Sequence, residues 1–192
     1  MQTGQSCVVL SSNVDSSGGG QYLRLPPVNF GRKSAGSGFS ICSWFRFDIA
    51  GADRSFSRVF EFGNGAPLDN ILLTKIGSSN RLRVFICCSY SCSVYVLPTP
   101  IAFDQWRHVC VVNQGNNWAY YDDGLIVGTQ TLCTLSDVTL MSNFLGRSNW
   151  WFDSLLHGSI SDFQIFDRSL SAMEVNALIS EYASGKLSFI SQ

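Results

Sequence analysis

The stretch FLGRSNWWFDSLLHGSISDFQIFDRSLSAMEV, residues 144–175, holds three signals of local structure in succession. The Gly-Arg-Ser-Asn sequence at 146–149 is typical of a turn, and the segment 158–167 is predicted to form a β-strand. Ser171 and Glu174 then match a capping box, in which the serine oxygen accepts from an unpaired helix amide and the glutamate reaches back. The stretch therefore predicts a turn, a strand and the start of a helix, in that order.

Outward from this stretch, the chain is predicted to be β-structure almost throughout. Apolar segments recur about every ten residues, and turn residues separate them. The Asp123-Gly124 pair is a strong hairpin signal, because glycine tolerates the positive φ that such turns demand, and 77–80 is a second clear turn. Both faces of 39–48 carry apolar side chains, which indicates a central strand. The predicted strands are 21–28, 39–48, 57–63, 69–76, 81–88, 93–98, 106–114, a hairpin over 118–130, 138–146 and 158–167.

One helix is predicted near the C-terminal end. An apolar stripe of Val175, Leu178 and Ile179 follows the capping box, and Gly185 is expected to end the helix. Roughly ten strands, one late helix and no linker longer than a turn indicate a single β-sandwich domain over residues 1–192.

The composition excludes several classes of protein. Of the 192 residues, 45% are hydrophobic and only 14% are charged, which does not suit a disordered chain. The formal net charge is −1 and Arg32-Lys33 is the densest basic spot, so no nucleic-acid partner is expected. No apolar run reaches the roughly 18 residues of a membrane span, and the first five residues lack the layout of a signal peptide. We therefore expect a folded domain without membrane insertion.

The seven cysteines are expected to differ in role. Neighbouring strand residues point to opposite faces, so Cys87 and Cys88 cannot share a partner across one ladder. If residues 89–91 form a hairpin loop, Cys88 and Cys92 lie opposite each other and close enough for a disulfide. A zinc site is disfavoured, because the C-C-x₃-C sequence has no second ligand pair at the usual spacing. The remaining cysteines stand in apolar segments and are predicted to be small core residues: Cys7, Cys42, Cys110 and Cys133.

Four segments together resemble the laminin-G-like branch of the concanavalin-A-like lectin/glucanase superfamily: 39–47, 58–73, 106–112 with 120–128, and 144–175. In the last segment, the Gly-Arg-Ser-x-Trp turn, the closing strand and the Leu-Ser-x-x-Glu helix start follow the order of the family. The resemblance covers about residues 20–182, the expected core. It implies an all-β fold, a two-sheet antiparallel jelly-roll sandwich with one short C-terminal helix. Since the superfamily includes lectins, hydrolases and adhesion modules, the fold alone does not fix the function.

Hydrolysis is tested first, and the sequence argues against it. Retaining glycosidases need two carboxylates about 5 Å apart. Catalytic glucanases of this fold carry a Glu-x-Asp-x-x-Glu strand, and no such pattern occurs here. Asp122 and Asp123 point to opposite faces or lie in a turn, and Glu61 stands alone on its strand. We predict that the protein is not an enzyme.

Calcium is the cofactor that the resemblance implies. Laminin-G-like domains often hold Ca²⁺ with an aspartate at the start of a strand after a glycine-containing loop, and Asp69 matches that position. Asn143 is the candidate for a second oxygen from a loop on the same rim. A hard cation takes several oxygens, and one carboxylate does not suffice. The alternative role for Asp69 is a strand-start residue that bonds local amides.

The paired tryptophans are the candidate sugar platform. Sugar recognition commonly sets an aromatic face against a pyranose, with nearby polar side chains holding the hydroxyls. In an extended segment Trp150 and Trp151 face opposite ways. Trp150 occupies the aromatic position of the family and is expected to pack in the core, whereas Trp151 is expected to be exposed. Asp153 has the alternative role of capping a turn. The candidate ligand-binding residues are Arg147, Asn149, Trp151 and Asp153.

Together these observations predict a non-catalytic binding module. Its expected partner is a glycan, a glycoprotein or another protein, met at a loop rim with calcium as the candidate cofactor. The alternative is a structural or assembly domain that packs within a larger complex without binding sugar. An extracellular or cell-surface location is slightly favoured, although the chain contains no Asn-x-Ser/Thr glycosylation site.

Overall fold

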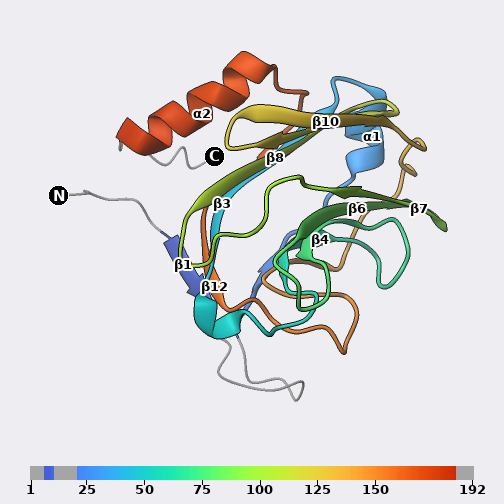
Figure 1. Cartoon of the computed structure of the whole chain (residues 1–192). Coiled ribbons are helices and arrows are strands. Elements are labelled where there is room, and N and C mark those ends of the chain that lie inside the picture. Colours follow the sequence, from blue (N-terminus) through green and yellow to red (C-terminus); the bar gives the residue numbers. More distant parts are fainter. Residues whose placement is uncertain (1–6, 11–20, 185–192) are drawn as a thin grey trace.

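Two antiparallel sheets of six strands each form the two layers of the molecule (Figure 1). The computed structural model describes residues 7–10 and 21–184. Sheet A consists, in spatial order, of β1 (Cys7–Leu10), β12 (Gly158–Phe166), β3 (Phe39–Phe47), β8 (Arg107–Gln114), β9 (Asn117–Asp122) and β10 (Leu125–Thr131). Sheet B consists of β2 (Leu23–Leu25), β11 (Asn143–Leu145), β4 (Arg58–Phe62), β5 (Ile71–Lys75), β6 (Leu82–Cys88) and β7 (Ser91–Val96). This arrangement confirms the predicted all-β, two-sheet sandwich.

The main core lies between the two sheets and follows from the alternation of side chains along each strand. On β3, every second residue from Phe39 to Phe47 is buried on the inward side, and all of them except Ser43 are apolar; β8 contributes Val109 and Val111. Each fully buried large apolar side chain contributes about 1.5–3 kcal/mol relative to an exposed one. The outward positions of the same strands therefore have to be satisfied in another way.

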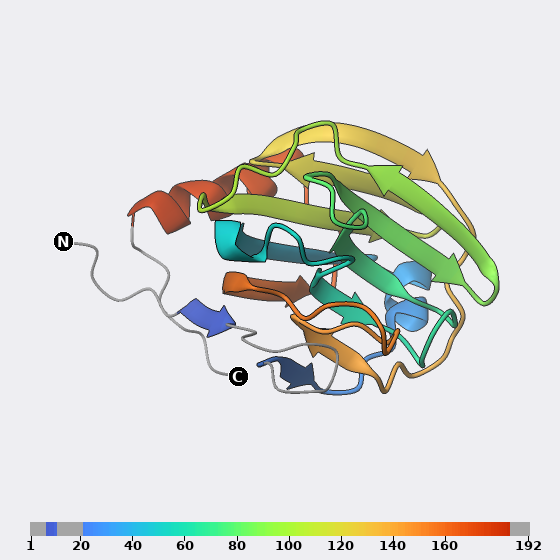
Figure 2. The same cartoon turned by 60° about the horizontal axis from the view of Figure 1, so that its bottom comes forward.

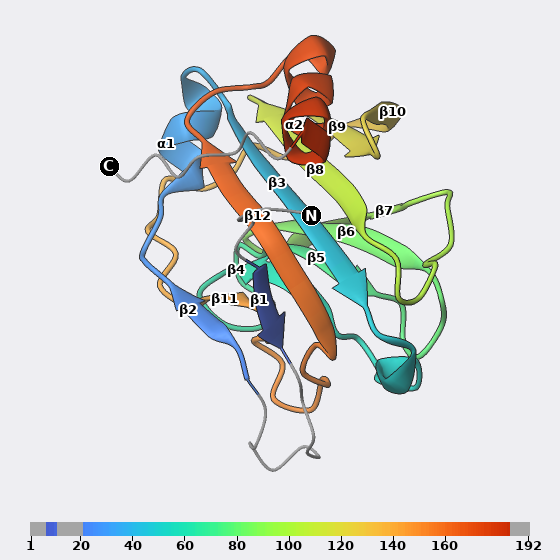
Figure 3. The ribbon, with the colours of Figure 1, turned by 90° about the vertical axis from the view of Figure 1, so that its left-hand side faces the viewer.

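On sheet A, a helix covers the outward positions. Helix α2 (Ala172–Ser184) lies against the face of sheet A that is turned to the viewer in Figure 3. A second apolar cluster forms there, in which Val175 is fully buried. This second layer explains why both faces of 39–48 are apolar. The buried members of the cluster are Cys42, Cys110, Val112, Tyr121, Leu170 and Val175.

The predicted turn and cap chemistry is confirmed. Asp123 and Gly124 form the two-residue turn between β9 and β10 with φ values of 46° and 83°. The backbone N–H of Ser171 donates to Glu174 Oε2 at 2.8 Å, and the N–H of Glu174 donates back to Ser171 Oγ at 3.3 Å. These bonds satisfy amides at the start of α2. The predicted helix stop, Gly185, lies outside the described residues.

Two short helices were not expected from the sequence. Helix α1 (Phe30–Ala35) begins at Asn29, whose side chain accepts from the backbone N–H of Arg32 at 3.0 Å. The 3₁₀-helix η1 (Ile49–Gly51) follows β3. Neither is long enough to show an apolar period, so only the cap residue signals α1. Among the described residues, no helix has the length and apolar character needed to cross a membrane.

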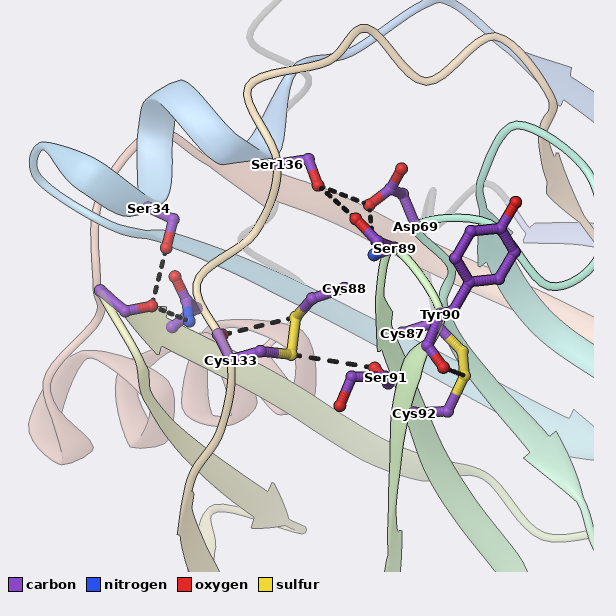
Figure 4. Close-up of a disulfide and its surroundings, with 12 residues drawn as sticks. Ser34, Asp69, Cys87, Cys88, Ser89, Tyr90, Ser91, Cys92, Cys133 and Ser136 are labelled. Carbon is purple, nitrogen blue, oxygen red and sulfur yellow. Dashed lines mark hydrogen bonds between the residues drawn. A yellow bond between two sulfur atoms is a disulfide. The ribbon is translucent and has the colours of Figure 1, made fainter.

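The structure corrects the predicted cysteine pairing. The turn after β6 is only Ser89-Tyr90, so β7 begins at Ser91 and the register sets Cys87 opposite Cys92. The predicted Cys88–Cys92 pair is therefore wrong by one position, because the loop is shorter than the three residues assumed. Three of the four expected core cysteines are also bonded, and the side chain of the fourth, Cys7, is outside the described part. The disulfides of the described residues are Cys42–Cys110, Cys87–Cys92 and Cys88–Cys133, and Figure 4 shows the last two.

Candidate functional site

A pocket of about 250 Å³ opens on the outer face of sheet B. The strand register places Leu72 of β5 beside Phe85 of β6, with their neighbours Leu73 and Val84 directed into the core. The pocket is smaller than the roughly 300–1,000 Å³ of sites for drug-sized ligands, so it suits one small ring. The lining residues are Phe56, Arg58, Leu72, Arg83, Phe85, Trp150, Phe152 and Asp153.

The wall of the pocket is the segment between β11 and β12, which runs beside the strands of sheet B (orange in Figure 2). Arg58 of β4 holds this segment in place. Its Nη2 donates to Asp153 Oδ2 at 2.6 Å, and its guanidinium carbon lies 5.4 Å from the ring centre of Trp150. The edge of the Trp150 ring system also meets Phe85, with the centroids 6.3 Å apart. One arginine thus fixes both the loop and the aromatic wall.

Beneath the pocket, Glu61 is the second acidic partner of Arg58. The Arg58 Nε donates to Glu61 Oε2 at 2.8 Å, and Asn70 Nδ2 donates to Glu61 Oε1 at 3.2 Å. Glu61 is fully buried, and burial raises the pKa of its carboxyl while Arg58 opposes that rise. The bonds of this carboxylate are those of a structural ion pair that is buried on the outer face of sheet B.

Arg83, the other cation of the pocket, is held differently. Its guanidinium carbon lies 5.6 Å from the ring centre of Phe56 and 5.5 Å from that of Phe85. Its Nε is buried without a hydrogen-bond partner. Burial lowers the pKa of Arg83, the charge of Arg58 lowers it further, and Asp153 acts in the opposite direction. Aromatic rings hold this arginine where carboxylates hold Arg58.

The two tryptophans differ from the expectation in one respect. Trp151 is 84% exposed, as predicted, and its ring centre lies 5.7 Å from that of Phe152, which is itself 58% exposed. Trp150 is not part of the core between the sheets, so the prediction of a core plug is wrong. It is half-buried on the outer face of sheet B, because the loop folds back over that face and presses the ring onto Arg58 and Phe85.

The other predicted ligand-binding residues occupy distinct places. Asp153 lines the pocket, where its Oδ2 accepts from Arg58 and from Ser148 Oγ at 2.9 Å. Asn149 donates from Nδ2 to the carbonyl of Ser142 at 3.0 Å. Arg147 lies over the Tyr22 ring, 4.5 Å from its centre, on the side of β2 and β11. The structure therefore places Asp153 in the lining of the pocket and sets Trp151 against the lining residue Phe152. Arg147 and Asn149 are not among the lining residues, and their contacts are with Tyr22 and Ser142 on the side of β2 and β11.

The candidate calcium ligands make local bonds. Asp69 has a φ of 54°, and its Oδ1 accepts from the N–H of Ser89 at 2.8 Å and from Ser136 Oγ at 2.9 Å (Figure 4). Asn143 is fully buried, and its Oδ1 accepts from the N–H of Gly63 at 3.3 Å. Neither belongs to a group of three or more His, Cys, Asp or Glu ligands in the described part of the chain. Calcium at these residues stays a prediction.

A larger groove of about 470 Å³ lies on the outer face of sheet A, beside the start of α2. Neutral residues line it, including Gln114, Thr129 and Ser169. Its aromatic residues, Trp118 and Tyr121, are only 1% and 6% exposed, so little ring surface is available to stack on a sugar. The pocket on sheet B has the exposed aromatic rings that this groove lacks.

Arg83, Phe56 and Phe85 were missed from the sequence. One signal could have found two of them. In the strand at 81–88, Arg83 and Phe85 stand two residues apart between core residues, so both point outward. A charged and an aromatic side chain on one outward face indicate a surface with a task other than packing. Nothing local in the sequence shows that Phe56 joins them.

Comparison with known proteins supports the fold. A family model described as the concanavalin A-like lectin/glucanases superfamily, of the laminin G type, matches residues 17–176. No curated protein sequence matches the chain. The residues matched by the model include every strand from β2 to β12 and the start of α2.

Among solved structures, the chain is similar to domain 4 of AbnA, an extracellular arabinanase from Geobacillus stearothermophilus, solved with arabinotriose. The two share 17% identity at a TM-score of 0.63, over 86% of this chain and 74% of that one. An SAP-like pentraxin from Limulus polyphemus shares 18% identity at a TM-score of 0.57, over 81% of this chain and 72% of the pentraxin chain. The binding domain of botulinum neurotoxin serotype D, solved with N-acetylneuraminic acid, shares 16% identity at a TM-score of 0.61, over 80% of this chain and 39% of the neurotoxin chain. The chain thus spans well under half of that neurotoxin chain, and these likenesses concern the fold.

Proposed function

Because the chain belongs to the concanavalin A-like lectin/glucanases superfamily, we propose that it is a non-catalytic module that binds glycans. The ligand site in this proposal is the pocket lined by Trp150 and Phe152, together with the Trp151 ring that contacts Phe152. The observation that carries it is the exposure of those two rings, 84% and 58%, beside a pocket that suits one ring-sized group. An exposed aromatic face is the usual partner for the apolar side of a pyranose.

The similar structures support a binding role in general terms. Domain 4 of AbnA was solved with arabinotriose, a neurotoxin domain with N-acetylneuraminic acid, and another with the protein synaptotagmin II. Glycans, glycoproteins and proteins are therefore all candidate partners. The Arg58–Glu61 pair argues against hydrolysis at this face, since the buried carboxylate is committed to a cation.

The direct test is binding of the intact chain to a glycan array. Trp151→Ala and Phe152→Ala should each weaken binding by about tenfold, which equals about 1.4 kcal/mol. Met173→Ala is the matched control, because Met173 is 82% exposed on α2, which packs on the other sheet. Equal loss in the control, or retention in both pocket variants, would remove the pocket from the proposal.

The alternative function is an assembly domain, and the same two exposed rings favour it, because large exposed aromatics also serve protein interfaces. If no glycan binds and Trp151→Ala alters only the oligomeric state or partner assembly, measured by light scattering, the assembly function replaces the lectin function.

Calcium and location are separate parts of the proposal. Repeating the array with a chelator tests calcium, and Asp69→Asn should reproduce the chelator effect if Asp69 is a ligand. We place the protein in an extracellular or cell-surface setting, since disulfides persist in oxidising compartments. Thiol titration of the denatured, unreduced chain should then find six of the seven cysteines unreactive, those of the three disulfides; seven free thiols would contradict that setting.

A further inference from the structure

The two arginines of the pocket differ in how their charge is compensated. Arg58 forms ion pairs with both Glu61, at 2.8 Å, and Asp153, at 2.6 Å. The side chain of Arg83 forms neither an ion pair nor a hydrogen bond with the described residues, and the rings of Phe56 and Phe85 lie against its guanidinium. Both acids near the pocket are committed to Arg58, so Arg83 is the cation left for a ligand.

The surroundings of Arg83 also preorganise it. A ring centre lies 5.6 Å from its guanidinium carbon and another lies 5.5 Å away, which restricts the rotamers of a long side chain. Its Nε is buried without an acceptor, while the residue as a whole is half-buried and lines the pocket. A charge that is partly removed from water and lacks an acceptor gains strongly from an anionic ligand.

From these contacts we infer that the pocket selects a sugar that bears a carboxylate, which Arg83 binds. This inference rests on the proposed glycan-binding function. A guanidinium presents a planar fork of donors that matches a carboxylate in bidentate geometry. The rings of Trp150 and Phe152 supply the apolar surface for the sugar ring beside it. A hexuronate and a sialic acid both offer this combination of ring and carboxylate.

The test uses matched soluble sugars on the intact chain, followed by calorimetry. The probes are methyl glucuronoside, its neutral counterpart methyl glucoside, N-acetylneuraminic acid, and glucose 6-sulfate. At least one carboxylate sugar should bind about tenfold more tightly than methyl glucoside, and comparison of the two acids identifies the source. Arg83→Gln should lower the affinity for that acid to the level of the neutral sugar, and Arg83→Lys should restore part of it.

The control variant is Arg81→Gln. Arg81 is exposed, stands two residues before Arg83 and uses its guanidinium on the carbonyl of Leu97. It should keep the preference for the acid, and a thermal melt of each variant checks that the fold is intact. Equal affinity for acidic and neutral sugars, a preference that survives Arg83→Gln, or binding of the sulfated sugar alone would overturn the inference. A pocket-dependent neutral glycan on the array would leave the proposed function standing in each of these cases.

Discussion

The outward side chains of the two sheets are shielded from water in different ways. On sheet A the outward residues, such as Cys42 and Cys110, are apolar, and α2 covers them through Val175. On sheet B the outward residues include Arg58, which the loop buries, and Arg83, which stays half-buried at the pocket. An apolar face must be sealed from water, whereas a charged face can stay partly open once its ion pairs are made. The open face is therefore where a ligand site can form.

The buried ion pair on the outer face of sheet B should give the largest effect on stability. Arg58→Ala leaves Glu61, which is fully buried, without its cation, and we expect a loss of about 3–5 kcal/mol in the free energy of unfolding. Chemical denaturation measures it. The reference variant is Arg32→Ala, which breaks an exposed pair with Asp137 and should change stability little. Similar losses in both variants would mean that the outer face of sheet B does not depend on its buried pair.

The disulfide on sheet A should give the next effect. Cys42 and Cys110 are 68 residues apart and directly opposite on β3 and β8, so replacing both by alanine should cost about 2–4 kcal/mol. Cys87 and Cys92 are only 5 residues apart, and the same change there should cost about 2 kcal/mol or less, because a shorter loop loses less entropy on closure. Denaturation of the two double variants compares them directly. The reverse order would contradict loop length as the cause of the difference between the two disulfides.

Features that depend on residues close together in the sequence are predicted better than features that depend on how separate segments pair. The hairpin at Asp123-Gly124 and the cap at Ser171 are local, so their residues suffice to predict them. The disulfide register fails by one residue, because a two-residue and a three-residue turn both fit the segment between Cys88 and Cys92.

The pocket on sheet B is harder to predict from the sequence than the hairpin or the helix cap. Trp151 is exposed as predicted, although residues 150–153 form a turn, with the N–H of Asp153 donating to the carbonyl of Trp150, and not the extended segment that the prediction assumed. Trp150 was assigned to the wrong layer, since the sequence gives no indication that its loop folds back onto Arg58, 92 positions away. Contacts between distant segments of this kind arise from tertiary packing.

Low pH should destabilise the fold through a histidine on the outer face of sheet A. His108 lies on the outer face of sheet A, with its Nδ1 buried and without a partner, and burial lowers its pKa to about 4. The unfolded chain binds the proton at its ordinary value of 6.5, so stability is full above pH 6.5 and is lost as the pH falls to about 4. We expect a loss of about 3 kcal/mol from this group.

Denaturation at a series of pH values, in wild type and His108→Gln, isolates that contribution. The variant should lose the part of the slope between pH 6.5 and about 4, although its stability at neutral pH can differ from that of wild type. An unchanged slope in the variant would assign the acid sensitivity to other groups.

Loss of the helix cap at Ser171 should give the smallest loss of stability, and its effect should be confined to α2 and sheet A. Ser171→Ala removes the oxygen that accepts from the N–H of Glu174, which should cost about 1 kcal/mol and loosen α2 over Val175. Hydrogen exchange should show faster amides in α2, while binding at the sheet B pocket stays as in wild type. Ser180→Ala is the control, because Ser180 lies within the helix and bonds only to the carbonyl of Asn176. If Ser171→Ala also weakens binding at the pocket, the two faces are coupled through the core and cannot be treated as independent.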